Sequence, residues 1–408
     1  MEKRDLVGRE EIINNEPNDR EMKPLLVPTQ PIYVKFRQGR ETLAPVKSGE
    51  FALNVFKVCF SSVGLWNHQA WNFIPRVLLA TVCLYQVSYS LYFDVLDKCR
   101  LNYKNETEKE KIAMEHSTYT EHIAEALLNL ASVSSFLVFT GCFMVAKRKR
   151  SACVLPSLST IENNDRKITL TLFAFFIFTT LLLASAIGLL YNTSIEIKLV
   201  EGSFCRHILV AAIAVQFLLH WVALNICHIF AFSSLALGTF AKDALRLIQN
   251  LQNGTLDDVI RIHEDLCSVV FSTASAYSVW FVLHWFTYGA GIPVAIIFVS
   301  RGLELIPVLD RLHVSLYLVC LFYLFLLPSV CAARITNHCL GICEEINHTT
   351  SDDWNEGHPF KDRHNIALFV SYAKERRCGF KIGKITFNAS LAWVSFFFGL
   401  TALLFHFF

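Results

Sequence analysis

Polar and aromatic side chains recur inside several long apolar segments of this 408-residue chain. Trp280, His284 and Tyr288 are spaced four residues apart, so an α-helix would place them on one face. Gln216 and His220 have the same spacing in another segment. Aromatic walls with a few hydrogen-bonding groups suit a small organic ligand. The candidate ligand-binding residues are Gln216, His220, Trp280, His284, Trp285, Tyr288, His313 and Tyr317.

The same residues also have a purely structural interpretation. Trp and Tyr are enriched at membrane interfaces, and a buried His can simply bond a neighbouring helix. The sequence leaves both interpretations open.

The last apolar segment, 385–408, carries a second pattern. No formally charged side chain follows Lys384, and the segment is long enough for a helix to cross a bilayer. Small or mildly polar residues recur every three or four positions, namely Asn388, Ala392, Ser395, Gly399, Ala402 and His406. In a membrane such a stripe faces protein or water, so it predicts either close helix packing or a pore between copies of the chain.

Motifs of other chemistries are missing from the sequence. It contains no nucleophile–base–acid set, no Gly-rich phosphate loop and no HExxH motif, so we expect no enzyme activity and no cofactor. The 13 cysteines have no paired CxxC spacing. Cys339 and Cys343 lie one helical turn apart beside His338, but a metal site there would need further ligands, so we expect no metal. The net charge of +2 gives no indication of nucleic-acid binding.

Composition predicts an all-α, polytopic membrane protein. Hydrophobic residues make up 53% of the chain and charged residues only 18%, below the roughly 25% of soluble domains. We expect seven spans, at 75–95, 123–146, 168–191, 208–237, 267–299, 312–333 and 385–408. Helical periodicity continues beyond the fourth span and before the fifth, which predicts helices that project into the cytoplasm.

These spans divide the chain into five expected parts. Residues 1–50 are polar and Pro-containing and predict a disordered cytoplasmic tail. Residues 51–74 suit a juxtamembrane or re-entrant helix. Residues 75–333 hold the first six spans, 334–384 form a cytoplasmic anchor segment, and 385–408 form the last helix.

Charge predicts the orientation. Basic residues are enriched in the connections around 147–167, 242–261 and 361–384, which places these and the N-terminus in the cytoplasm and the C-terminus outside. The glycosylation sequons at Asn105 and Asn192 then lie outside. Cys99 and Cys205 are the cysteines expected in that oxidising space, where a disulfide between them is one possibility.

Several short motifs resemble the insect gustatory and odorant receptor superfamily. Near the C-terminus, an apolar run followed by His406 and Phe407 is similar to a family hallmark of Thr-Tyr, five apolar residues and Gln-Phe. His406 replaces the Gln, and the Thr-Tyr is absent. Segments beginning at Gly379, Arg261 and Leu53 resemble further family patterns. The chain therefore resembles a divergent gustatory receptor-like member.

The resemblance implies a chemosensory, ligand-gated, non-selective cation channel in the plasma membrane. It would be a homotetramer or heterotetramer that conducts monovalent and divalent cations, contacts membrane lipid and responds to a small organic ligand in taste. The ligand pocket would lie in the outer half of the second to sixth helices, and the cytoplasmic helix ends would join the subunits. The last helices would line a central pore through His406, Phe407, Leu403, Ala402, Gly399 and Ser395. His406 and Phe407 would form the gate, and a His at this position would make gating pH-sensitive.

Two other functions stay open at this point. A seven-helix metabotropic receptor would need an extracellular N-terminus, and the chain contains neither a DRY-like nor an NPxxY-like motif. A non-conducting relative acting as a membrane scaffold would fit the loss of the family's Thr-Tyr and Gln.

Overall fold

The computed structural model describes residues 73–90, 126–142, 165–196, 203–302 and 308–395, with single positions at 58, 61, 144, 397 and 401. The principal helices are α3 (Phe73–Tyr89), a helix at Ala126–Cys142, α5 (Asp165–Glu196), α6 (Ser203–Gln249), α7 (Leu256–Gly302), α8 (Val308–Asn347) and α9 (Arg363–Arg376). The expected tail at 1–50 lies outside the described residues, as does nearly all of the segment 51–74.

The described helices form a multi-pass membrane fold. Within the described residues, four helices are long and apolar enough to cross a bilayer, at Lys167–Tyr191, Val210–Gln249, Leu256–Ile297 and Arg311–Asn347. α6 has 47 residues, which at 1.5 Å per residue gives about 70 Å, more than twice the roughly 30 Å bilayer core. α7 and α8, with 47 and 40 residues, are also longer than the bilayer core requires. Periodicity predicts this for α6 and α7; the count of seven spans and the side of the extension stay predictions.

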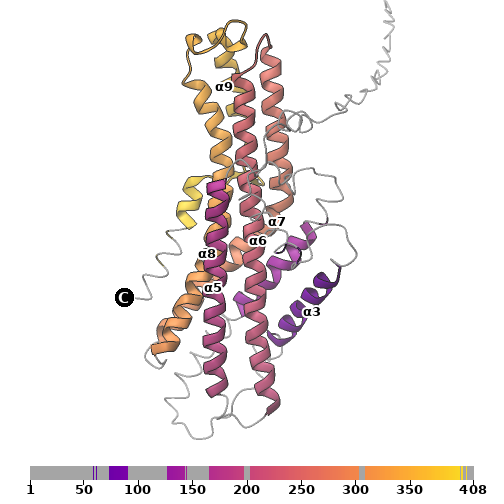
Figure 1. The fold of residues 1–408 in the computed structure, drawn as a ribbon, viewed down its shortest axis with the longest axis vertical. Helices are drawn as coiled ribbons and strands as arrows, with labels where there is room; N and C mark the ends of the chain where they lie inside the picture. The colour runs from indigo at the N-terminus through magenta and orange to yellow at the C-terminus, as the bar shows by residue number, and fades with distance from the viewer. Residues whose placement is uncertain are drawn as a thin grey trace, which may run out of the picture. The chain divides into compact units, whose positions relative to one another are not determined.

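Contacts between helices group them around α6 and α8. α6 contacts α3, α5, α7 and α8, and α8 also contacts α5, α7 and α9 (Figure 1). The prolines inside α7 and α8, Pro293 and Pro328, leave both helices continuous. Such residues are tolerated in membrane helices when neighbouring groups satisfy the freed backbone.

A compact segment folds back after α8. Two short 3₁₀ turns, η6 (Ser351–Asp353) and η7 (Pro359–Lys361), lead into α9. His358 in this segment is buried; its Nε2–H donates to the carbonyl of Ile248 at the end of α6 (2.7 Å), and its Nδ1 accepts from the N–H of Phe360 (3.0 Å). The anchor segment expected at 334–384 thus consists of the end of α8 and a separate unit bonded to the end of α6.

The expected start of the last helix at Ile385 is wrong. Ile385–Thr386 (β2) is a strand that pairs antiparallel with Lys381–Ile382 (β1), around a two-residue turn that begins at Gly383 with φ +60°. Glycine at the first turn position is typical of a two-residue hairpin. The helix follows Asn388, whose side-chain oxygen accepts from the N–H of Leu391 (3.1 Å), and it is described over residues 389–395. Asn388 therefore caps this helix, and the hairpin is an exception to the expected all-α fold.

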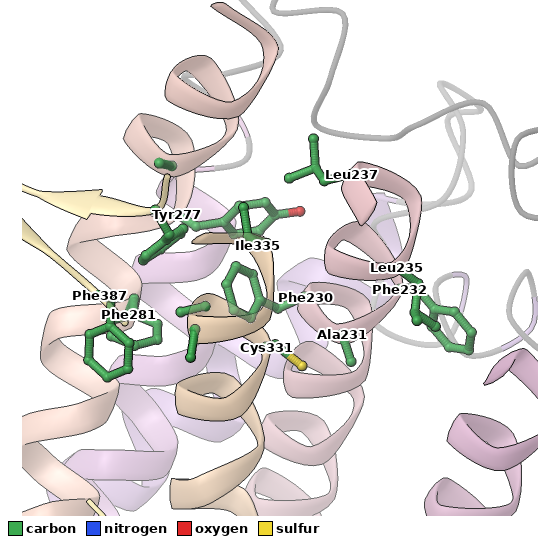
Figure 2. Close-up of a cluster of buried hydrophobic side chains, with 14 of the residues drawn as sticks. Phe230, Ala231, Phe232, Leu235, Leu237, Tyr277, Phe281, Cys331, Ile335 and Phe387 are labelled. Atoms are coloured by element: carbon green, nitrogen blue, oxygen red, sulfur yellow. The ribbon is translucent and has the colours of Figure 1, made fainter. Parts of the chain in front are cut away.

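The hairpin is fixed to the bundle by aromatic packing and by one hydroxyl. Phe387 packs edge-on against Phe281 of α7, with ring centroids 5.1 Å apart (Figure 2). Phe380 contacts both Phe230 of α6 and Phe281. The hydroxyl of Thr336 on α8 donates to the carbonyl of Phe387 (2.6 Å) and accepts from the N–H of Phe380 (3.0 Å). The start of the last helix is thus held by three long helices.

Candidate functional site

Hydrogen-bonded polar side chains inside the bundle join α6 to α8. His220 is fully buried, and its Nδ1–H donates to the carbonyl of Gln216 one turn earlier (2.8 Å). Its Nε2 then accepts from the hydroxyl of Tyr317 on α8, at 3.4 Å. The side-chain amide of Gln216 reaches the same hydroxyl at 3.4 Å. Three predicted ligand-binding residues are therefore in one network.

His284 on α7 contacts three other helices. Its Nε2 lies 3.0 Å from the carbonyl of Leu324 on α8, and because a carbonyl only accepts, Nε2 carries the hydrogen. Its Nδ1 then accepts from the hydroxyl of Ser135, on the Ala126–Cys142 helix, at 2.8 Å. The Sγ of Cys227 on α6 lies 3.6 Å from Nε2. The imidazole is thus held in one neutral tautomer.

Tyr288 and Trp280 extend this arrangement in both directions along α7. The ring of Tyr288 lies 4.5 Å from that of His284 and 6.1 Å from that of His220, so it links the two networks. Trp280 lies 5.1 Å from His284 on the other side. Both are 0% exposed. Within the described part of the chain, neither the Tyr288 hydroxyl nor the Trp280 Nε1–H has a hydrogen-bond partner.

We call this set the His–Tyr cluster; it comprises Gln216, His220, Trp280, His284, Tyr288 and Tyr317. None of these side chains carries a formal charge in the tautomers given above. Each unsatisfied buried donor costs free energy unless a ligand or water accepts from it. The cluster can therefore offer two hydrogen-bond donors to a neutral acceptor, inside aromatic walls.

Two predicted ligand residues lie outside the cluster. Trp285 is next to His284 in sequence, but its Nε1–H donates to the hydroxyl of Ser395 on the last helix (3.0 Å), and its ring stacks on Phe325. His313 lies one turn before Tyr317 on α8, with its imidazole packed over Gly188 of α5. Among the described residues, its Nδ1 has no hydrogen-bond partner.

The described part of the last helix contacts its own chain through the predicted stripe. Ser395 is 1% exposed and Ala392 is partly buried, whereas Trp393, Val394 and Phe397 are more than half exposed. The other predicted pore residues, Gly399, Ala402, Leu403, His406 and Phe407, lie outside the described residues. Asn105 and Cys99 also lie outside them. Asn192 and Cys205 fall within α5 and α6, but the structure does not describe their side chains.

Sequence reasoning missed a second His–Tyr pair. His228 is eight residues after His220, so its position on the same face of α6 was readable from the spacing. Its Nδ1–H donates to the carbonyl of Leu224 (2.8 Å), and its Nε2 accepts from the hydroxyl of Tyr323 (3.0 Å), whose ring stacks on Phe178. α6 and α8 are therefore joined twice by the same type of contact.

Metal ligation has no support in the part of the chain that the structure describes. No group of three or more His, Cys, Asp or Glu side chains there is arranged to hold a metal ion. His338, Cys339 and Cys343 stay on one stretch of α8.

No family model and no curated protein matches this chain. Among solved structures, the fold matches the insect olfactory receptor OR5 from Machilis hrabei in complex with eugenol, with a TM-score of 0.57 and 14% identity, over 92% of this chain and 99% of that chain. A second structure of the same receptor matches with a TM-score of 0.54 and 13% identity, over 91% and 98% of the two chains. At this identity the likeness shows the fold alone, which is the multi-pass membrane fold of an insect odorant receptor.

Proposed function

We propose that this protein is a ligand-gated, non-selective cation channel of the insect chemosensory receptor type, with a gustatory role. The observation that carries the proposal is the match over nearly the whole length of both chains to a receptor solved with a small odorant. The His–Tyr cluster gives this chain a buried polar–aromatic site of the kind that binds small organic molecules. We place the protein in the plasma membrane, with the N-terminus inside.

The ligand in this proposal is a small, neutral molecule that carries a hydrogen-bond acceptor. Tyr288 and Trp280 both offer an open donor, while His220 and His284 have both ring nitrogens engaged. The oxygen of an ester, ketone, ether or phenol would accept from either donor. A carboxylate would lose most of its hydration without gaining a cation, which is costly in a buried site.

The pore in this proposal forms where four copies of the last helix meet. Its gate is at His406 and Phe407, with Leu403, Ala402 and Gly399 along the wall, about three helical turns beyond Ser395. Ser395 is the link to the ligand site, because Trp285, which bonds its hydroxyl, is the neighbour of His284 on α7. A ligand that shifts α7 at the His–Tyr cluster would then displace the pore helix through this hydrogen bond.

The test is ligand-evoked current from the full-length protein in a cell without other chemosensory receptors. A panel of neutral acceptor-bearing compounds should open a cation current that Phe407→Ala alters. Tyr288→Phe should weaken the response to an acceptor-bearing agonist about tenfold, the equivalent of one hydrogen bond of about 1.4 kcal/mol. The response to a hydrocarbon analogue should not change.

Two controls separate the proposal from its alternatives. An epitope at residue 1 should be unreachable on intact cells; a reachable epitope would favour a metabotropic receptor. Images of the purified particle should show fourfold symmetry. Surface-expressed tetramers that pass no current across the whole panel would favour a non-conducting scaffold.

Two covalent features complete the proposed topology. Glycosylation at Asn105 or Asn192 would appear as a mass shift on treatment with a glycosidase. A Cys99–Cys205 disulfide would appear as a peptide pair that reduction separates.

A further inference from the structure

Four basic side chains converge where α5, α6 and α8 meet. They are Lys167 near the start of α5, Lys242 on α6, and Arg334 and His338 on α8, and we call them the basic quartet.

The backbones of α6 and α8 approach closely at this point. A Cβ placed on Gly238 would lie 2.7 Å from Cδ2 and 2.9 Å from Nε2 of His338. Lys242 follows Gly238 by one helical turn, and Arg334 precedes His338 by one turn. Lys167 joins them from α5, which contacts both of these helices.

The four groups are close enough to act on one another electrostatically. The charges of Arg334 and Lys242 act on Lys167, and the charges of Arg334, Lys167 and Lys242 act on His338. Such repulsion raises the free energy of the folded chain unless an anion offsets it.

No acidic side chain that the structure describes forms an ion pair with Lys167, Lys242 or Arg334. The quartet therefore keeps positive charge that an anion from elsewhere can offset.

The position of the quartet indicates the source of that anion. The apolar runs predicted as spans begin at 168 in α5 and end at 237 in α6 and at 333 in α8. All four basic groups thus lie at one predicted boundary between membrane and cytoplasm. Lys242 and Arg334 are exposed, and Lys167 and His338 are partly exposed, so the quartet is accessible at the depth of lipid headgroups.

We infer that the basic quartet binds the phosphorylated headgroup of an anionic phospholipid of the cytoplasmic leaflet, and that this headgroup bridges α5, α6 and α8. Arg334 can grip a phosphate with two parallel N–H donors, while Lys167 and Lys242 act as point charges. Basic pockets between membrane helices on the cytoplasmic side recognise headgroups of this kind. A headgroup with several phosphates, as in a phosphoinositide, matches three cations and a histidine better than the single net charge of phosphatidylserine.

Binding can be measured on the purified full-length protein in a neutral detergent. Fluorescence anisotropy of a labelled short-chain phosphoinositide bisphosphate reports affinity, and phosphatidylserine and phosphatidylcholine serve as competitors. We expect the phosphoinositide to bind most tightly and phosphatidylcholine not to compete. Each of Lys167→Gln, Lys242→Gln and Arg334→Gln should weaken binding about fivefold, which corresponds to about 1 kcal/mol for each basic side chain. The triple variant should lose about 100-fold.

A matched control uses basic residues of α9. Arg363 and Lys374 are exposed and lie outside the quartet, so Arg363→Gln with Lys374→Gln should leave the affinity unchanged within twofold. Equal losses in this control and in the quartet variants would overturn the proposal, because binding would then follow net charge alone.

Measurements on the wild-type protein provide a second test, which does not depend on the folding of the variants. Its affinity for the lipid should fall steeply with added salt, as expected for a multivalent phosphate contact. The soluble inositol phosphate headgroup should compete, but more weakly than the lipid in a mixed micelle. Competition by the soluble headgroup at equal affinity, or binding that salt does not change, would overturn the assignment to a lipid.

Discussion

Replacing Thr336 by Val should loosen the hairpin that precedes the last helix. The two side chains have nearly the same shape, so the substitution removes a hydroxyl and little else. That hydroxyl serves two buried backbone groups, the carbonyl of Phe387 (2.6 Å) and the N–H of Phe380 (3.0 Å). A buried polar group left without a partner costs about 1–3 kcal/mol, so two such groups should lower the free energy of hairpin opening by at least about 2 kcal/mol.

The thiol of Cys378, just before the hairpin and 3% exposed, reports this opening. Opening made easier by about 2 kcal/mol should speed its labelling by a maleimide about 30-fold, if labelling follows the population of the open state. The variant Cys378→Ser identifies the labelled site by mass spectrometry. Thr336→Ser is the matched control, because it keeps the hydroxyl and loses only a methyl group. A Val variant that is labelled at the wild-type rate, or a Ser variant labelled as fast as the Val variant, would refute the role given to the hydroxyl.

Three further predictions concern the anchor segment and the neighbourhood of the His–Tyr cluster. His358→Ala removes the hydrogen bond from the segment to Ile248 of α6 and the one from the N–H of Phe360 within the segment. The loss should cost about 2–3 kcal/mol and raise hydrogen–deuterium exchange in 351–361 while 256–270 stays protected. Gly188→Ala places a Cβ on the imidazole of His313, so this ring must move; the agonist concentration for half-maximal current should change while surface expression does not. The pKa of Asp353 lies below its ordinary value because the N–H and hydroxyl of Thr350 donate to the carboxylate. The stabilisation that the Asp353 carboxylate provides is therefore present above the unfolded pKa of about 4 and is lost as the pH falls through the folded-state pKa. Hydrogen–deuterium exchange of the 348–361 peptide, corrected for intrinsic rates, should rise at low pH in the wild type. The Asp353→Asn variant should show no such change.

Hydrophobic runs and residue spacing in the sequence were sufficient to predict the long helices and one face of the candidate ligand site. Long apolar runs predicted α5 to α8, and continued periodicity predicted that α6 and α7 extend beyond the membrane core. The four-residue spacing of Trp280, His284 and Tyr288 placed them on one face of α7, and all three are buried together. A helical period is a property of the segment itself, so one sequence reveals it.

Partners between helices could not be predicted in the same way. Nothing in the spacing says that His220 meets Tyr317 or that His284 meets Ser135, because these contacts depend on how far one helix is displaced along another. The hairpin at 381–386 was missed for a related reason. Its apolar residues continue into the last helix, and only Gly383 at a two-residue turn distinguishes it.

Ser395 also shows that the sequence alone does not identify the partner of a helix face. Periodicity correctly groups Ser395 with Ala392, yet it cannot tell whether their face meets a second copy or the same chain. The structure places Ser395 against Trp285 of α7. Its neighbours Trp393, Val394 and Phe397 are more than half exposed, so this face of the helix is accessible to other molecules.

α7 is the helix that joins the candidate ligand site to the last helix. Its buried face carries His284 and Tyr288 of the His–Tyr cluster, Trp285 bonds the last helix, and Phe281 packs on both ends of the hairpin. These contacts lie within two helical turns, and a packed helix segment of that length moves as a unit more readily than it deforms. A ligand that binds one position of α7 better than another would thereby favour one position of the last helix, by no more than the difference between its two binding free energies. In the channel proposed here, Trp285→Phe should accordingly change gating without changing ligand affinity, whereas Tyr288→Phe should change affinity first.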